Sequence, residues 1–210
     1  MKSYYKERAP VYDRVYKYPE RQADLRFLEK HIPKQFAGLD VLEIAAGTGY
    51  WTQFISTKAH SVLSTDVAKE TLDELINKKL SATVRVCEAD AYSLKSLPNN
   101  FTGAFAGLWF SHIPIQRRTE FLTGLHKKLV AGSTVQFLDN SVAQCDRLPL
   151  SHSDEFGNTY QNRVLDNGVN YEVVKNFPAE QELLKLTSDI AFDQEFRKLE
   201  NYWLFQYKTK

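Results

Sequence analysis

The residues of this chain best suited to chemistry lie within 41–52, where an apolar run, an acid and two glycines follow one another. The apolar residues of 41–44 predict a short strand that is buried on both faces. Gly47 and Gly49 permit a tight turn and leave no side chain between the backbone and a ligand. Glu43 places a carboxylate at the mouth of that turn. A strand, a glycine turn and a helix in this order predict a nucleotide site at the edge of an open α/β sheet.

The spacing of these residues argues against two common kinds of nucleotide site. A dinucleotide site has a third glycine three residues after the second, and here that position is Thr52. A phosphate-binding P-loop needs a Gly-Lys-Ser/Thr run, which does not follow Gly49. The acid just before the turn would also repel a phosphate. The pattern favours a ligand that is cationic or carries hydroxyl groups.

Two further acids end the next predicted strands, Asp66 after 61–66 and Asp90 after 83–87. With the first motif they resemble the class I S-adenosylmethionine-dependent methyltransferases, and the resemblance is strong over 39–140. The family signature is an acid, any residue, Gly or Ala, and two spaced glycines. It corresponds here to Glu43-Ile44-Ala45-Ala46-Gly47-Thr48-Gly49, with Ala45 in place of the first glycine.

The resemblance implies S-adenosylmethionine (SAM) as methyl donor and S-adenosylhomocysteine (SAH) as product. It implies that Asp66 accepts hydrogen bonds from both ribose hydroxyls and that Asp90 contacts the adenine edge beside the Ala91 amide. The cofactor-binding residues expected on this basis are Glu43, Ala45, Gly47, Gly49, Asp66, Val67, Asp90, Ala91 and Tyr12. The alternatives are a simple tight turn at the glycines, a helix cap at Asp66, a loop acid at Asp90, and a nicotinamide dehydrogenase.

Methyl transfer from an activated sulfonium needs mainly positioning and exclusion of water, and a base only when the acceptor must lose a proton. His112 is the candidate base, unless it merely caps the helix expected from Pro114. Arg163 would suit a carboxylate acceptor, although it could be a solvated strand residue or part of a dimer edge. The acceptor-binding residues expected are Tyr5, Trp109, His112, Tyr160 and Arg163. The five histidines show no metal-ligand spacing, so no metal is expected.

The expected elements alternate along most of the chain. Strands at 39–45, 61–66, 83–87, 101–110 and 134–138 alternate with helical patterns. A hairpin around Asn167-Gly168, a helix after Pro178 and two closing strands follow. This order predicts an α/β fold, a doubly wound, mostly parallel seven-stranded sheet with helices on both faces and the last strand antiparallel. We expect one domain over 1–210, made of a helical cap (1–38), a cofactor-binding core (39–140), an inserted hairpin or lid (141–177) and a closing segment (178–210).

Composition limits the choice of acceptor. The formal net charge of +1 gives no reason to expect nucleic acid, and two cysteines make no disulfide framework. Neither a signal peptide nor a membrane span is evident. We therefore expect a cytoplasmic enzyme, monomer or homodimer, that methylates a small molecule. Its layout is similar to that of ubiquinone and menaquinone methyltransferases, without implying a quinone acceptor. The alternatives are an RNA or protein methyltransferase and a non-catalytic SAM-binding partner protein.

Overall fold

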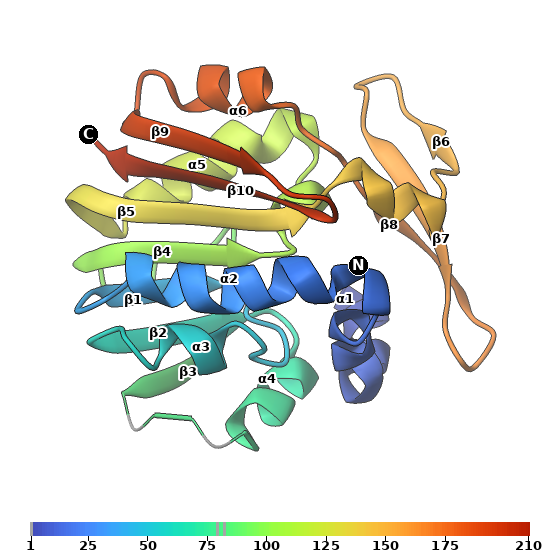
Figure 1. Cartoon of the computed structure of the whole chain (residues 1–210), viewed down its shortest axis with the longest axis horizontal. Helices are drawn as coiled ribbons and strands as arrows, with labels where there is room; N and C mark the ends of the chain where they lie inside the picture. The colour runs from blue at the N-terminus through green and yellow to red at the C-terminus, as the bar shows by residue number, and fades with distance from the viewer. Residues whose placement is uncertain (1, 79, 82) are drawn as a thin grey trace.

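The chain forms one large and one small β-sheet in the computed structural model, which describes residues 2–78, 80–81 and 83–210, without the side chains of 2 and 3. The large sheet has seven strands in the order β3-β2-β1-β4-β5-β10-β9 (Figure 1). These strands are β1 (Asp40–Ile44), β2 (Ser61–Asp66), β3 (Val84–Glu88), β4 (Phe101–Gly107), β5 (Leu129–Asn140), β9 (Ala191–Lys198) and β10 (Tyr202–Thr209). Strands β1 to β5 pair in parallel, and β10 is antiparallel to both of its neighbours. The predicted doubly wound, mostly parallel sheet is confirmed.

The strand order reverses at β1, which pairs with β2 on one side and with β4 on the other. The chain therefore moves outward to β3 and then returns across the sheet to β4. In open α/β sheets a crevice forms at such a reversal, outside the carboxyl ends of the strands. Ligands bind in that crevice, so the topology alone points to the ends of β1, β2 and β4.

Helices cover both faces of the large sheet. Helices α2 (Gln22–Gln35) and α3 (Thr52–Ile55) contribute Leu25, Leu28, Ile32 and Ile55 to one apolar cluster, which also holds Val41 and Phe105. Helices α5 (Arg118–His126) and α6 (Glu180–Thr187) contribute to the other cluster, with Phe121, Leu125 and Leu183. Helix α4 (Lys69–Ile76) follows β2 and buries Leu72 and Leu75. These buried stripes recur at helical spacing, which is why the sequence pattern locates the helices.

Two segments lie at the carboxyl-end edge of the parallel strands (Figure 1). One is the N-terminal arm, helix α1 (Lys2–Arg8) and the 3-10 helix Ala9–Tyr16. The other is a small antiparallel sheet of β6 (His152–Ser153), β7 (Thr159–Val164) and β8 (Asn170–Val174). Its β7–β8 connection carries the Asn167-Gly168 turn that the sequence indicates, with Gly168 at a φ of 80°.

Arm and small sheet contact each other directly. Glu7 accepts hydrogen bonds from the Tyr171 hydroxyl at 2.7 Å and from the Asn167 amide at 3.0 Å. Arg14 pairs with Asp166 at 3.0 Å. The two segments together therefore form a cover over the edge where the crevice opens. In the part of the chain that the structure describes, every helix is too short or too polar to cross a bilayer.

Candidate active site

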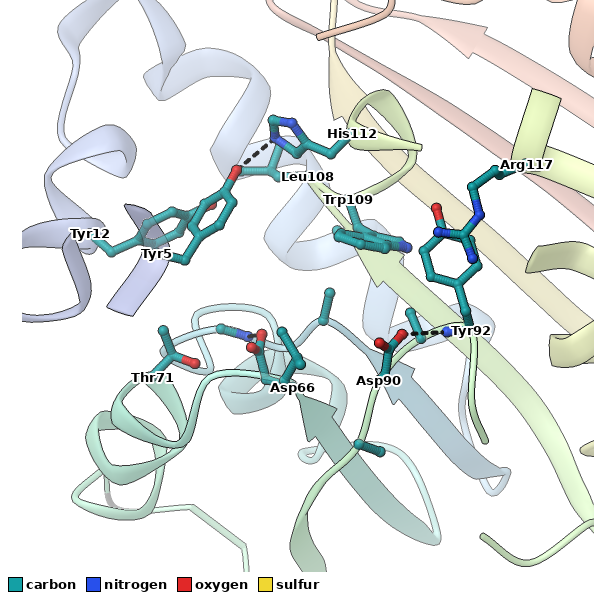
Figure 2. Close-up of a pocket in the computed structure, with 16 residues that line it drawn as sticks. Tyr5, Tyr12, Asp66, Thr71, Asp90, Tyr92, Leu108, Trp109, His112 and Arg117 are labelled. Carbon is teal, nitrogen blue, oxygen red and sulfur yellow. Dashed lines mark hydrogen bonds between the residues drawn. The ribbon is translucent and has the colours of Figure 1, made fainter. Parts of the chain in front are cut away.

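A cavity of about 320 Å³ opens at the carboxyl ends of β1 to β4 and is covered by the arm (Figure 2). Its walls come from four strand ends, from α4 and from both arm helices. The lining residues are Tyr5, Tyr12, Ala45, Gly47, Asp66, Val67, Thr71, Ala89, Asp90, Ala91, Tyr92, Gly107, Leu108, Trp109, His112 and Arg117. The strand reversal therefore coincides with this cavity.

The glycine turn supplies the floor of this cavity. Gly47 and Gly49 have φ angles of 57° and 78°, in the left-handed region that favours glycine. A Cβ atom on Gly47 would meet nothing within 4 Å, so its backbone is open to a ligand. A Cβ on Gly49 would lie 2.6 Å from the Leu75 side chain, so this glycine permits the helix to pack closely. Ala45, which replaces the first glycine of the motif, also has a positive φ of 51°.

Glu43 lies beneath the turn and not at its mouth, where the sequence placed it. Its Oε2 accepts hydrogen bonds from the hydroxyls of Thr52 at 2.6 Å and Ser64 at 2.7 Å. The side chain is 1% exposed and is absent from the cavity wall. Burial raises its pKa to about 7, and the two hydroxyls oppose that rise. Glu43 therefore ties β1 to β2 and to α3, and so holds the turn that faces the cavity.

Asp66 and Asp90 lie on the cavity wall, at the ends of neighbouring strands. The two carboxylate oxygens of Asp66 accept hydrogen bonds from the amide of Gly47 at 2.9 Å and from that of Ala68 at 2.8 Å. Burial raises the pKa of Asp66, whereas these amides lower it. Asp90 accepts from the amide of Tyr92 at 2.8 Å. Both acids are thus oriented by backbone groups.

Tyr92, Trp109 and Arg117 form a largely aromatic part of the cavity wall, which begins next to Asp90. The guanidinium of Arg117 lies 3.6 Å from the centre of the Tyr92 ring. The indole of Trp109 lines the cavity, and its buried Nε1 has no hydrogen-bond partner among the described residues. A buried donor without a partner costs free energy, but this atom itself is not exposed to the cavity.

Tyr5 and His112 close the other end of the cavity (Figure 2). The Nδ1 atom of His112 lies 2.6 Å from the carbonyl of Val174, which can only accept a hydrogen bond, so Nδ1 carries the proton. Nε2 then accepts from the Tyr5 hydroxyl at 2.8 Å. The imidazole is committed to these contacts and does not cap the helix after Pro114. Burial and the nearby charges of Lys175 and Arg163 lower the pKa of His112 well below its ordinary value.

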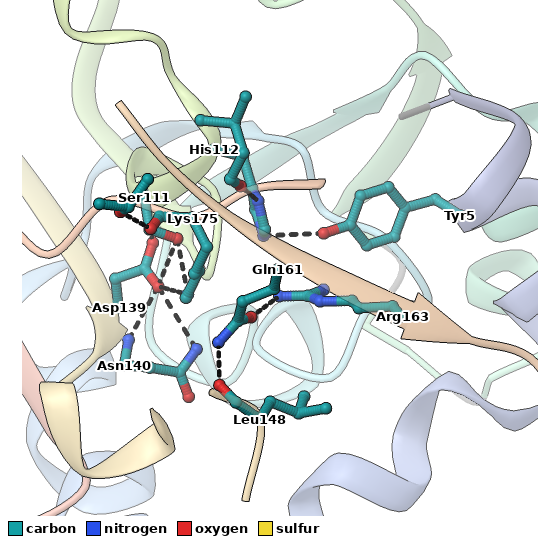
Figure 3. Close-up of polar contacts among 11 residues, drawn as sticks. Tyr5, Ser111, His112, Asp139, Asn140, Leu148, Gln161, Arg163 and Lys175 are labelled. Carbon is teal, nitrogen blue, oxygen red and sulfur yellow. Dashed lines mark hydrogen bonds and ion pairs between the residues drawn. The ribbon is translucent and has the colours of Figure 1, made fainter. Parts of the chain in front are cut away.

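Behind His112 lies a buried polar cluster that sequence reasoning missed (Figure 3). The ammonium of Lys175 donates to the Ser111 hydroxyl at 2.7 Å and to Asp139 at 2.8 Å. Asp139 also accepts from the backbone amide of Ser111 at 2.8 Å. Lys175 and Asp139 are both fully buried. Burial lowers the pKa of Lys175 to about 8, and the charge of Lys175 lowers that of Asp139 against its own burial.

Arg163 stands directly behind Tyr5 and outside the cavity wall (Figure 3). It is 6% exposed, donates to the Gln161 side chain at 3.0 Å, and lies 5.6 Å from the centre of the Tyr4 ring. Its Nε has no partner among the residues described here. Tyr160 lies away from the cavity, where its hydroxyl donates to Asp154 at 2.9 Å.

The structure thus brings most of the expected site residues to one cavity and leaves Glu43, Gly49, Tyr160 and Arg163 off its wall. Sequence reasoning missed Thr71, Ala89, Tyr92, Gly107, Leu108 and Arg117. Ala89 follows a predicted strand, a signal that could have found it, whereas Gly107 and Leu108 lie inside the predicted strand 101–110, which in the structure ends at Gly107. Thr71 and Arg117 come from helix starts and had no such signal.

Comparisons with known proteins address the identity of this site. Residues 41–132 match a family model described as a methyltransferase domain. A structure of DhpI with SAH is 23% identical, with a TM-score of 0.81 over 99% of this chain and 94% of that one. DhpI with SAM and HEP is 25% identical, with a TM-score of 0.79 over 99% and 95%. The methyltransferase-domain match and these SAH- and SAM-bound neighbours support a SAM-dependent methyltransferase.

The chain also shares its fold with a structure described as a SAM-dependent methyltransferase from Clostridium acetobutylicum ATCC 824. That structure is 17% identical, with a TM-score of 0.64 and 98% coverage of both chains. Curated protein sequences gave no match. SAM as the cofactor agrees with the chemistry of the cavity. Asp66 ends β2, Asp90 follows β3, and the backbone is open at Gly47.

Proposed function

We propose that this methyltransferase methylates a small anionic molecule that binds between Tyr5, Trp109 and His112. The observation that carries the proposal is the continuity of the cavity. One cavity, partly open to solvent, is lined at one end by Asp66 and Asp90 and at the other by Tyr5 and His112. Methyl donor and acceptor can therefore meet inside a single pocket that the arm shields from water.

The donor end would hold SAM through the residues that line it. Asp66 would accept from the ribose hydroxyls and Asp90 from the adenine edge, as the family resemblance implies. The open backbone at Gly47 leaves room for the methionine part. When bound, SAM supplies a methyl group that its sulfonium has already activated. The chain itself needs to orient the acceptor and to exclude water.

Positive charge at the acceptor end supports an anionic acceptor. Arg163 and Lys175 are both buried near Tyr5 and His112, and Asp139 is the acid that pairs with Lys175. Among the described residues, Arg163 forms no ion pair with a carboxylate, and its Nε has no hydrogen-bond partner. A buried charge without a counter-ion is costly, and an anion beside it would reduce that cost. Arg163 lies off the cavity wall, so it would act on the acceptor through its charge and not by direct contact.

His112 would serve the acceptor in one of two ways that depend on the acceptor's own charge. An oxygen that is already anionic needs only orientation before it attacks the methyl group. An acceptor that carries a proton on the attacking atom needs a base, and the unprotonated Nε2 of His112 lies at the cavity. The low pKa of the ring keeps this nitrogen free of a proton at neutral pH.

The docked arm favours a small acceptor over a polymer. Lys6 pairs with Glu70 at 2.7 Å and Lys78 pairs with Asp13 at 2.7 Å, so ion pairs tie the arm to α4 and to the residues after it. An RNA or protein methyltransferase would need an open groove at this edge of the sheet.

A defined panel of acceptors tests the proposal. The purified enzyme and SAM would be incubated with carboxylic acids, phosphate monoesters and alkylphosphonates, each beside its neutral methyl ester, and SAH formation would be measured. We expect SAH above the acceptor-free rate with one class of anion and not with the matched ester. Equal rates with an anion and its ester would contradict an anionic acceptor. A complete absence of SAH with these anions and with small-molecule extracts would contradict small-molecule methylation.

A further inference from the structure

The last residue of β8, Val174, and the two residues after it contact the run 111–113, which includes His112. The carbonyl of Val174 accepts from the Nδ1 of His112 at 2.6 Å. The backbone amide of Asn176 donates to the carbonyl of Ser111 at 2.8 Å, and its side-chain amide donates to the carbonyl of Ile113 at 3.1 Å. The small sheet therefore does more than cover the cavity, because its last strand leads into a segment that fixes the loop after β4.

Lys175 lies at the centre of this segment, and its role is not explained by stability alone. Its ammonium reaches the Ser111 hydroxyl and the carboxylate of Asp139, and both ionic side chains are fully buried. Desolvation commonly costs a buried ion pair as much as the attraction returns, so apolar residues of similar volume are often at least as stabilising. The Lys175–Asp139 pair lies next to the candidate base His112, so we looked for a functional reason for it.

The charges around His112 act on its imidazole from several directions. Lys175, after β8, and Arg163, on β7, disfavour the protonated ring, while Asp139, on β5, favours it. Tyr5, on α1, stays neutral because burial raises its pKa to about 12. Burial of the ring itself is the largest influence and also favours the neutral form. Lys175 is also held against Asp139 at 2.8 Å, so its charge and that of Asp139 act on the ring together.

We propose that Lys175 is a positioning residue for His112. Together with Val174 and Asn176 it holds the ring with Nδ1 protonated, and its charge keeps the ring neutral, so that Nε2 faces Tyr5 and the cavity as an acceptor. The inference rests on the proposed place of His112 in the acceptor site. In this proposal the residues at the end of the small sheet set the tautomer and the charge of His112.

Nitrogen-15 NMR of the imidazole in the SAH-bound enzyme tests this proposal without a known acceptor. The His112 signal would be assigned by its loss in His112→Gln. In the wild-type protein we expect Nδ1 protonated, Nε2 unprotonated, and no titration between about pH 6 and 8. In Lys175→Met the pKa of His112 should rise by at least about one pH unit, because a positive neighbour is lost and Asp139 is left uncompensated.

Two matched variants separate the charge effect from a loss of folding. Lys175→Met with Asp139→Asn removes both charges, and it should leave the pKa of His112 below that of the single variant, because the uncompensated carboxylate is gone as well. Lys128→Met removes another buried lysine, whose ammonium donates to the carbonyls of Lys95 and Leu97, and should leave His112 unchanged.

An Nε2-protonated tautomer in the wild-type protein would overturn the proposal, and this result requires no variant. An unchanged titration of His112 in folded Lys175→Met would overturn it as well. These readouts do not depend on turnover. Failure to find an anionic acceptor would refute the proposed substrate class and leave the NMR result intact.

Discussion

The hydroxyl of Tyr5 donates to Nε2 of His112 over 2.8 Å, and this contact joins residues 107 positions apart. It links the N-terminal helix to the loop that follows β4 (Figure 2). The rings of Tyr5 and His112 also meet edge to face, with centroids 5.7 Å apart. The end of the cavity that we propose for the acceptor is therefore complete only when the arm is docked on the sheet.

Removal of the Tyr5 hydroxyl should weaken the acceptor end selectively. Tyr5→Phe keeps the ring and its aromatic contacts but loses the hydrogen bond to His112, which is worth about 1 kcal/mol. We expect the KM for the acceptor to rise by about fivefold, while the Kd for SAH changes by less than about twofold. Steady-state kinetics and calorimetry would measure the two constants. Tyr160→Phe is the control, because that hydroxyl binds Asp154 away from the cavity, and an equal effect of both changes would refute the assignment.

Asp66 should be essential for holding SAM. Asp66→Ala removes the acceptor assigned to the ribose, and a hydrogen bond to a charged group is worth about 1.5–3 kcal/mol. The Kd for SAH should rise by about 10- to 100-fold, as measured by calorimetry. Asp73→Ala offers a comparison on nearby α4, since Asp73 is exposed and pairs with Lys69. SAH affinity that is equal in the two variants would remove Asp66 from the site.

Arg163 should matter for the acceptor and not for SAM. In Arg163→Gln the positive charge behind Tyr5 is lost, so the KM for an anionic acceptor should increase by about tenfold or more while SAH binds as before. Arg197→Gln on β9 is a suitable control, because Arg197 is exposed and pairs with Glu195. If Arg163→Gln leaves the acceptor KM unchanged, Arg163 supports only the packing around Tyr4.

Glu43 should give stability a distinctive dependence on pH. Its pKa rises from 4.5 to about 7 on folding, so the folded state binds more protons between these values. Its contribution is fully present below pH 4.5 and is lost as the pH rises through about 7. The free energy of unfolding of the wild type, relative to Glu43→Gln, should therefore fall by up to about 3 kcal/mol across this range. Urea unfolding at several pH values measures the difference, and a constant difference would show that Glu43 does not titrate there.

The sheet, and the meeting of Asp66 and Asp90 at one cavity, could be predicted because their signals are local. Each of Asp66 and Asp90 follows an apolar run, and the ends of adjacent parallel strands meet in space. Alternation of strands and helices predicted the sheet for the same reason. The predicted position of the Glu43 carboxylate at the mouth of the turn was wrong. The side chain lies under the loop, where it accepts hydrogen bonds from Thr52 and Ser64, and does not face the cavity.

The acceptor end could be predicted only in part because its contacts are distant in the sequence. Lys175 meets Ser111 and Asp139 over 64 and 36 positions, and no pattern around Lys175 marks it as buried. Residue type suggested Arg163, but its location behind Tyr5 follows from the way the small sheet docks against the arm. Such placements depend on tertiary packing, which sequence periodicity does not encode.

The most direct test of methyl transfer to a small anionic molecule is to identify the product that receives the methyl group. Methyl-labelled SAM and the enzyme would be added to a cell extract separated into small molecules, RNA and protein, with Asp66→Ala as the matched control. The account predicts label in a small anionic product that binds an anion exchanger before methylation, and little label with the variant. Label confined to RNA or protein, or recovered only in a neutral or cationic acceptor, would contradict it.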